Sequence, residues 1–486
     1  MAPRSWAAAA AAAASLAAAR GGDVRTWGDA ISGGRWPVGS GEDEINDGSW
    51  AQIVGCGESF VARSSVHGLE AWGAAAGLNA SVDLGGEIVQ MVCTESNSFA
   101  MLGDSGSVVA WGSQLPSEEV ASGLAGRQDI ASLHTTQGAI AALTENGEVF
   151  AWGDATLGGS LEGLTFTSPV VALEATSVAF AALDEAGRVT VWGSDELSGD
   201  IGDLNLTSGI ASIVANDVAF AALTTEGNVL TWGESTADFP NLDLTGRVVR
   251  ILSGHQAFVA ILEDGSVRTW GHPLYGGVSE GVDFSGEIQS VVSTKFAMAA
   301  LKTSGEVVTW GDVLQGGNST GHDLSGNVKQ LVANNGAFAA LRDDGSVSTW
   351  GLVSIGGGVA LDGNMTQIVA TQKAFAGLHV NGTVEAWGDE AYGGDMKLAS
   401  IGDNVVTALF SNDFAFATLV DPPPPFDHKE LVPYVVPTVM GIVIILLGCA
   451  LCTISNRVKR EMGNGQSTTK DAILSEVSLT NNGATY

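Results

Sequence analysis

The chain has 486 residues, of which 45% are hydrophobic and only 15% charged, so it can bury a large core and is not a disordered tail protein. Asp and Glu number 54 against 21 Lys and Arg, which gives a net charge of −33 and argues against nucleic acid as a partner, because phosphate backbones repel such a surface. Four cysteines are too few for a disulfide-built scaffold and show no zinc-type pairing in a soluble region.

The first 19 residues have the outline of a secretory signal peptide. Met1 to Arg4 carries one positive charge, an alanine-rich stretch runs from Trp6 to Ala19, and its last three residues are small enough for cleavage. A low-complexity alanine tract is the alternative interpretation. A signal peptide predicts that the residues after it are translocated across a membrane.

Residues 20–420 consist of one repeat of about forty residues, the period expected for stacked supersecondary units. Each repeat carries Trp-Gly, and the tryptophans are Trp27, Trp72, Trp111, Trp152, Trp192, Trp232, Trp270, Trp310, Trp350 and Trp387. Their spacing of 37 to 45 residues predicts ten structural units of one kind.

One unit, residues 328–351, shows the pattern. An apolar strand VKQLVA is followed by the polar turn Asn334–Gly336, a second strand AFAAL, a hairpin turn and a third strand that ends at Trp350. Gly345 lies five residues before that tryptophan, and nine of the ten units have glycine there, as a hairpin residue with positive φ requires. The second unit departs, because Gly68 lies one position late.

A loop follows each Trp-Gly and leads to the first strand of the next unit. Six of these loops contain a glycine pair, at Gly33-Gly34, Gly158-Gly159, Gly276-Gly277, Gly316-Gly317, Gly356-Gly357 and Gly393-Gly394. A small three-stranded sheet is marginal alone, so we expect neighbouring sheets to stack, with the tryptophan filling each interface.

The two ends of the repeat region predict a closed ring. Residues 22–27 resemble a third strand with no first or second strand before them, and residues 405–420 resemble a first and second strand with no third. The fragments complete one unit, as in a ring whose seam joins both ends of the chain. The fold class is therefore all-β, a β-propeller of about ten three-stranded blades closed by N- and C-terminal strands, plus one transmembrane α-helix.

The GxVxxWG hairpin with its glycine loop resembles the repeat of the regulator of chromosome condensation family, over Gly21 to Val420. Family repeats are longer and usually continue with a Gly-Gln-Leu-Gly run that is absent here. The shorter, three-stranded variety is similar to the bacterial β-lactamase inhibitory protein type II. The resemblance implies a propeller and protein binding. The family's exchange-factor and ubiquitin-ligase roles are not expected, since no ligase domain follows and the charge is unsuited to chromatin.

The C-terminal region predicts membrane anchoring. Residues 421–430 form a Pro-rich stalk, residues 431–454 carry no charge and are long enough for a transmembrane helix, and residues 455–486 form a short cytoplasmic tail. Arg457, Lys459 and Arg460 follow the span directly, so the positive-inside rule places the propeller outside the cytoplasm. We expect a single-pass type I protein of the plasma membrane or an endomembrane.

Two features fit that compartment. Cys56 and Cys93 fall near the ends of adjacent first strands, where they form either a disulfide between the first two complete blades or two buried free thiols. Five glycosylation sequons precede the span, at Asn79, Asn205, Asn318, Asn364 and Asn381.

The search for chemistry predicts no catalytic, cofactor-binding or metal-binding residue. The seven histidines lack metal-ligand spacing, and the acidic turns lack the pattern of a calcium loop. The sequence therefore predicts a non-enzymatic membrane protein whose propeller binds an unknown protein ligand through the loops after Trp-Gly. The longest loop, Asp29 to Trp50, offers Trp36 and Trp50 as anchors, unless they pack beneath it. The alternatives are a cytoplasmic-facing adaptor propeller tethered to a membrane and, less favoured, an enzyme with a site among the axial loops.

Overall fold

The computed structural model describes residues 23–34, 49–64, 66, 68–74, 84, 86–194, 204–233, 246–361, 363–395 and 405–421. The chain divides into two compact units, Met1–Pro422 and Pro423–Tyr486, and the second lies wholly outside the described residues. The predicted signal peptide, transmembrane span and tail fall outside them as well. No helix within the described ranges is both long and apolar enough to cross a membrane.

The described residues of the first unit form ten three-stranded antiparallel sheets, which we number as blades 1 to 10. Their strands are β2 (Trp50–Cys56), β3 (Ser59–Ser64) and β4 (Gly68–Gly73) in blade 1; β5 (Ile88–Cys93), β6 (Ser98–Gly103) and β7 (Val108–Gly112) in blade 2; β8 (Ile130–Thr135), β9 (Ala139–Thr144) and β10 (Val149–Gly153) in blade 3; β11 (Val170–Ala175), β12 (Ala179–Asp184) and β13 (Val189–Gly193) in blade 4; β14 (Ile210–Ala215), β15 (Ala219–Thr224) and β16 (Val229–Gly233) in blade 5; β17 (Val248–Ser253), β18 (Ala257–Leu262) and β19 (Val267–Gly271) in blade 6; β20 (Ile288–Ser293), β21 (Ala297–Lys302) and β22 (Val307–Gly311) in blade 7; β23 (Val328–Ala333), β24 (Ala337–Arg342) and β25 (Val347–Gly351) in blade 8; β26 (Met365–Ala370), β27 (Ala374–His379) and β28 (Val384–Gly388) in blade 9; and β29 (Val405–Ser411), β30 (Ala415–Asp421) and β1 (Asp23–Gly28) in blade 10. The helical elements are α2 (Glu118–Leu124) and the short turns η1 (Ala155–Leu157), η2 (Pro273–Tyr275), η3 (Val313–Gly317), η4 (Val353–Ile355) and η5 (Glu390–Tyr392).

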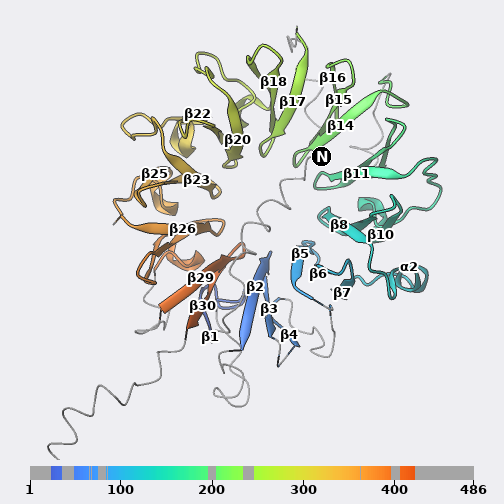
Figure 1. Cartoon of the computed structure of the whole chain (residues 1–486), viewed down its shortest axis with the longest axis horizontal. Coiled ribbons are helices and arrows are strands. Elements are labelled where there is room, and N and C mark those ends of the chain that lie inside the picture. The colour runs from blue at the N-terminus through green and yellow to red at the C-terminus, as the bar shows by residue number, and fades with distance from the viewer. Residues whose placement is uncertain are drawn as a thin grey trace, which may run out of the picture. The chain divides into compact units, whose positions relative to one another are not determined.

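Each blade places its first strand at the centre of the ring and its third strand at the rim (Figure 1). The middle strands are rich in alanine and almost wholly buried; in β9 and β21 every residue is buried. Small side chains on both faces of a middle strand let the neighbouring blades approach closely. The predicted repeat of strand, turn, strand, hairpin and strand is therefore confirmed.

The predicted seam is also confirmed. β1 pairs antiparallel with β30, with Trp27 opposite Phe416, and β30 pairs with β29. Trp27 is fully buried, and its ring stacks on that of Phe416 with centroids 5.3 Å apart. One hydrophobic cluster joins blade 10 to blade 9, and another joins Phe410 of blade 10 to Phe60 and Trp72 of blade 1. Both ends of the described chain thus build one blade, and that blade closes the ring.

The glycine pairs after Trp-Gly have a role that the sequence did not reveal. In five interfaces the carbonyl of the first glycine accepts a hydrogen bond from the tryptophan Nε1 of the next blade. The pairs are Trp27 with Gly393, Trp72 with Gly33, Trp192 with Gly158, Trp310 with Gly276 and Trp350 with Gly316, at 2.8 to 3.0 Å.

The tryptophans that lack this bond mostly follow loops without a glycine pair. Trp152, Trp232 and Trp270 have no such pair before them, and their buried Nε1 atoms have no hydrogen-bond partner in the described part of the chain. Trp111 and Trp387 lack a partner as well, although Gly356-Gly357 precedes Trp387. Since a buried N–H without a partner costs free energy, the glycine pair stabilises those interfaces in which it is used.

Candidate functional site

One end of the ring gathers two kinds of loop from every blade. The first strand of a blade runs toward this end, the second away from it and the third toward it again, so the turn between strands one and two lies beside the loop after Trp-Gly. In blade 3, Asp154 N donates to Gly138 O at 2.9 Å, and Thr136 Oγ1 donates to Leu157 O at 2.9 Å. We call this end the turn face, and the opposite end, formed by the hairpins between strands two and three, the hairpin face.

Short polar side chains fix the turns. In blade 8, Asn334 Oδ1 accepts a hydrogen bond from Ala337 N at 2.8 Å, while Asn334 Nδ2 donates to Ile355 O at 2.7 Å. Thr136 holds the same place in blade 3 and accepts from Ala139 N at 3.0 Å. Asn and Thr suit this position because their side chains bind the backbone a few residues on. One side chain thereby holds both the turn and the neighbouring helical turn.

The middle residue of each turn contributes to a mostly polar ring around the axis, which we call the turn ring. Its members are Gly57, Glu95, Gln137, Ser177, Asp217, His255, Lys295, Asn335, Gln372 and Asp413. Eight neighbouring pairs are joined by a backbone N–H···O bond of 2.7 to 3.2 Å, for example from Asp413 to Gly57 and from Gln372 to Asp413. The turn face is therefore held rigid by contacts from blade to blade.

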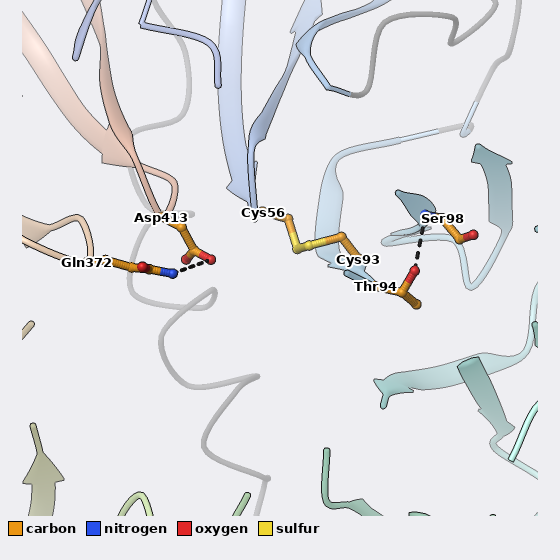
Figure 2. Close-up of a disulfide and its surroundings, with 6 residues drawn as sticks. All are labelled: Cys56, Cys93, Thr94, Ser98, Gln372 and Asp413. Carbon is orange, nitrogen blue, oxygen red and sulfur yellow. Dashed lines mark hydrogen bonds between the residues drawn. A yellow bond between two sulfur atoms is a disulfide. The ribbon is translucent and has the colours of Figure 1, made fainter. Parts of the chain in front are cut away.

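A disulfide lies where the turn ring passes from blade 1 to blade 2. Cys56, next to Gly57, is bonded to Cys93, with 6.0 Å between their Cα atoms (Figure 2). No backbone hydrogen bond joins Gly57 to Glu95 within the described ranges. The disulfide thus joins these two blades at the turn face, where the other neighbouring turns are mostly joined by a backbone hydrogen bond.

Blades 5 to 10 surround a cavity of about 490 Å³ at the turn face. Its lining includes Asp217, His255, Lys295, Gln372 and Asp413 of the turn ring. Asp217 Oδ2 lies 2.6 Å from His255 Nδ1, and Gln372 Nε2 donates to Asp413 Oδ2 at 3.2 Å (Figure 2). Removal from water raises the pKa of the Asp413 carboxyl; the Gln372 hydrogen bond lowers it, Glu58 raises it and Lys295 lowers it.

The helical turns of blades 6, 7 and 8 carry exposed aliphatic side chains, and two of these turns bind residues that line the cavity: Thr294 Oγ1 donates to Gln315 O at 3.2 Å, and Asn334 Nδ2 donates to Ile355 O at 2.7 Å. We call Leu274, Val313, Leu314 and Val353 the apolar arc; their exposed fractions are 63%, 63%, 75% and 73%. Single exposed apolar residues are ordinary, but successive blades place these on one arc of one face.

Aromatic stacking supports the helical turns from the next blade. Tyr275 of η2 stacks on Phe296 of blade 7 with ring centroids 4.8 Å apart. Tyr392 of η5 stacks on Phe414 of blade 10 at 5.4 Å, and Lys373 Nζ lies 4.4 Å from the centre of the Tyr392 ring. The helical turn that carries Leu274 is therefore fixed by packing, as is the equivalent turn of blade 9, and a preformed binding surface requires such fixed turns.

Two partly buried titratable groups interrupt an apolar position of the inner strands. His134 and Glu174 occupy the fifth position of the first strand in blades 3 and 4. The equivalent residues of the other aligned blades are Val54, Val92, Val214, Leu252, Val292, Val332, Val369 and Phe410. Burial lowers the pKa of His134 to about 4 and raises that of Glu174 to about 8. His134 Nε2 lies 3.0 Å from Ser132 Oγ.

Of the two interpretations left open for Trp50, an exposed anchor or a residue packed beneath the loop, the structure supports the second. Trp50 begins β2 with no exposed surface and belongs to the cluster between blades 10 and 1. Its size and the strand that it opens make it a core residue, as the alternative interpretation had it. Trp36 lies outside the described residues.

The sequons lie mostly away from the turn face. Asn205, Asn318, Asn364 and Asn381 are exposed, and Asn79 lies outside the described residues. Asn381 belongs to the hairpin between β27 and β28, and Asn364 accepts a backbone bond from Val380 of that hairpin. Nothing in the described ranges brings together three or more His, Cys, Asp or Glu side chains that hold a metal ion.

Comparisons with known proteins found similarity of fold at low identity. No family model and no curated protein matches the chain. Among solved structures, the ectodomain of the Physcomitrella patens receptor kinase CR4 is 19% identical, with 54% of this chain and 72% of that chain covered and a TM-score of 0.37. Prp20p from Saccharomyces cerevisiae, whose structure was described together with its binding to Gsp1p and histones, is 14% identical, with 85% and 94% covered and a TM-score of 0.37. Human WBSCR16 is 14% identical, with 82% and 100% covered and a TM-score of 0.37.

A second structure of the yeast protein, described as Kap60 bound to yeast RCC1 (Prp20), is also among these neighbours. Similarity of this strength carries no argument about function, so the function must be inferred from the turn face itself. The sequence pointed to the loops after Trp-Gly but missed the turn ring. In the sequence, the only signal of the turn ring was a Thr or Asn, followed by a polar residue, after most first strands.

Proposed function

We propose that the propeller is a protein-binding module whose recognition surface is the turn face. The observation that carries this proposal is the apolar arc beside a polar cavity on a rigid face. Loops on a rigid scaffold suit binding because little conformational entropy is lost when the partner docks. The positions of Asn364 and Asn381 support it further, since a glycan at either sequon leaves the turn face open.

We propose further that a single membrane span anchors this module with the propeller outside the cytoplasm. The proposal rests on the uncharged residues 431–454, the basic residues after them and the leader-like N-terminus. The Cys56–Cys93 disulfide is compatible with an oxidising compartment. Receptor-like or adhesion-like binding is the function that fits this topology.

A site-specific photo-crosslinker tests the binding surface in the full chain expressed in cells. A crosslinker in place of Leu314 on the turn face is compared with one in place of Val380, which is 74% exposed on the hairpin face. We expect a discrete protein adduct from the first position and none from the second. Equal adducts from both positions, or none from either, would contradict the proposed function.

Protease protection tests the topology. The full chain is translated with sealed microsomes and carries an epitope near Gly305. Protection of the epitope supports an outside propeller, and digestion from the cytosolic side would establish the adaptor alternative instead. Mobility shifts after glycosidase treatment report on the sequons independently.

An enzyme with an axial site is a second candidate, favoured by the Asp217–His255 pair beside the cavity. A carboxylate bound to Nδ1 orients an imidazole as a general base. Among the described residues, however, no hydroxyl or thiol is hydrogen-bonded to the other ring nitrogen of His255. The pair lacks a nucleophile within hydrogen-bond reach, so binding is the better account.

A further inference from the structure

The apolar arc is not required by the fold, and the repeats themselves supply the comparison. The helical turns of blades 3 and 9 have the same backbone but place Thr156 and Ala391 where blades 6 and 7 have Leu274 and Leu314. Glu390 likewise stands where blade 8 has Val353. Since polar or small residues serve equally well at these positions, the exposed aliphatic side chains have no structural reason to be there.

The hairpin face shows the contrast. Its turns are mostly polar, as in Glu263-Asp264-Gly265 and Asp343-Asp344-Gly345, and the large exposed aliphatic residues of its described hairpins are Val66 and Val380. Beside the hairpins, the first strands also start with exposed valines, for example Val405 next to Gly382. On the turn face, the exposed aliphatic residues stand on the helical turns of three successive blades, and two of these turns contact residues that line the cavity. Such clustering marks an interaction site on an otherwise soluble surface.

The charge beside the arc is negative. Asp217 and Asp413 line the cavity, and Asp312 and Asp389 begin the helical turns η3 and η5. Lys295 is the only lysine in the cavity lining. A chain with a net charge of −33 also repels a second copy of itself, which argues against self-association through this face.

We propose that the apolar arc and the adjoining cavity form one docking site for a positively charged segment of a partner protein that carries aliphatic or aromatic side chains. The arc receives the apolar side chains, and the carboxylates of Asp217 and Asp413 receive the cationic ones. Hydrophobic contact supplies affinity, and charge complementarity selects the partner and speeds its approach. This inference rests on the proposed protein-binding function and names the chemistry of the partner.

The test uses the full chain in detergent and two fluorescent synthetic peptides with the same leucine positions, one with lysines and one with glutamates between them. The first variant pair is Leu274→Thr with Leu314→Thr, which copies the side chain of Thr156, and its matched control is Val380→Thr on the hairpin face. The second pair is Asp217→Asn with Asp413→Asn, and its control is Glu226→Gln, an exposed hairpin carboxylate. Because the Leu→Thr substitutions are exposed, they test the site without depending on the buried core.

We expect the lysine peptide to bind saturably and the glutamate peptide not to bind. Each turn-face variant should weaken binding at least about tenfold, while the controls stay within about twofold of the parent chain. The charge variant should also lose most of its salt dependence.

Equal weakening by the hairpin controls would show nonspecific attraction to an acidic protein and overturn the site. Equal binding of both peptides, or of neither, would overturn the proposed partner chemistry. In that case the crosslinks at Leu314 decide separately whether the turn face binds a protein of another kind.

Discussion

Replacement of Gly316 tests the contact between the glycine loops and the next blade. This residue has a φ of +104°, and a Cβ placed on it would lie 2.5 Å from Phe338 Cδ2. Its carbonyl also accepts the 3.0 Å hydrogen bond from Trp350 Nε1. Gly316→Ala should therefore impose backbone strain and also push apart the packing of blades 7 and 8.

A control within the same loop separates the two costs. Gly321 has a φ of +92°, but no heavy atom lies within 4 Å of a Cβ built there. Positive φ costs an L residue about 1–2 kcal/mol, and an extra methyl group in a packed interior costs about 1–3 kcal/mol. We expect Gly316→Ala to lower the free energy of unfolding by about 2–5 kcal/mol and Gly321→Ala by about 1–2 kcal/mol.

Scanning calorimetry of the two variants measures the difference. For a domain of about 400 residues, 1 kcal/mol corresponds to about 1 °C in Tm, so the predicted losses are about 2–5 °C and about 1–2 °C. Equal losses would show that the close approach of Gly316 to Phe338 has no energetic weight, and would refute the role given to the glycine pairs.

Three further predictions concern the interior. Glu174, with its pKa raised to about 8, binds its proton more tightly in the folded state, so the free energy of unfolding should fall as the pH rises from about 4.5 to 8. His134, with its pKa lowered to about 4, should oppose this fall below about pH 6.5. Glu174→Gln should therefore abolish the decline above pH 6.5 in unfolding curves recorded across the range. A wild-type curve that is flat from pH 6.5 to 8 would contradict the desolvation of the Glu174 carboxyl. Replacing Cys56 and Cys93 by alanine opens a link that closes 37 residues and should cost about 3–4 kcal/mol by denaturant titration. An unchanged midpoint would mean that the non-covalent contacts between blades 1 and 2, such as the hydrogen bonds of Gln52 to Ile88, hold them unaided. Asn412→Ala leaves two backbone N–H groups and one carbonyl without their side-chain partner and should cost about 2–3 kcal/mol; a loss below about 0.5 kcal/mol would show that water replaces these bonds.

The architecture could be predicted from the sequence because each of its parts is local and repeated. Trp-Gly, the hairpin glycine five residues earlier and the alanine-rich middle strand recur in order, and the two incomplete ends match each other. The buried Trp27 opposite Phe416 confirms the consequence of that match. Repetition makes a weak local signal strong when it occurs ten times.

The turn face could not be predicted in the same way. Asp217 and Asp413 lie 196 positions apart in the sequence, and only closure of the ring brings both to one cavity. The arc carried by Leu314 was hidden because an exposed leucine and a buried one look alike in a loop sequence. The opposite ambiguity affected Trp50. It was counted as the last residue of a loop and so as a possible exposed anchor, but it is the first residue of strand β2 and is buried.

A cross-link at the seam tests the closed ring most directly. Arg25 of β1 pairs with Thr418 of β30, so the double variant Arg25→Cys with Thr418→Cys should form an intramolecular disulfide, identified by mass spectrometry of the non-reduced peptides. The control Arg25→Cys with Thr349→Cys places the second thiol in blade 8 and should form none. A linked 25–418 peptide in the monomeric chain is the predicted result; free thiols at both positions, or a bond only between two chains, would contradict the ring.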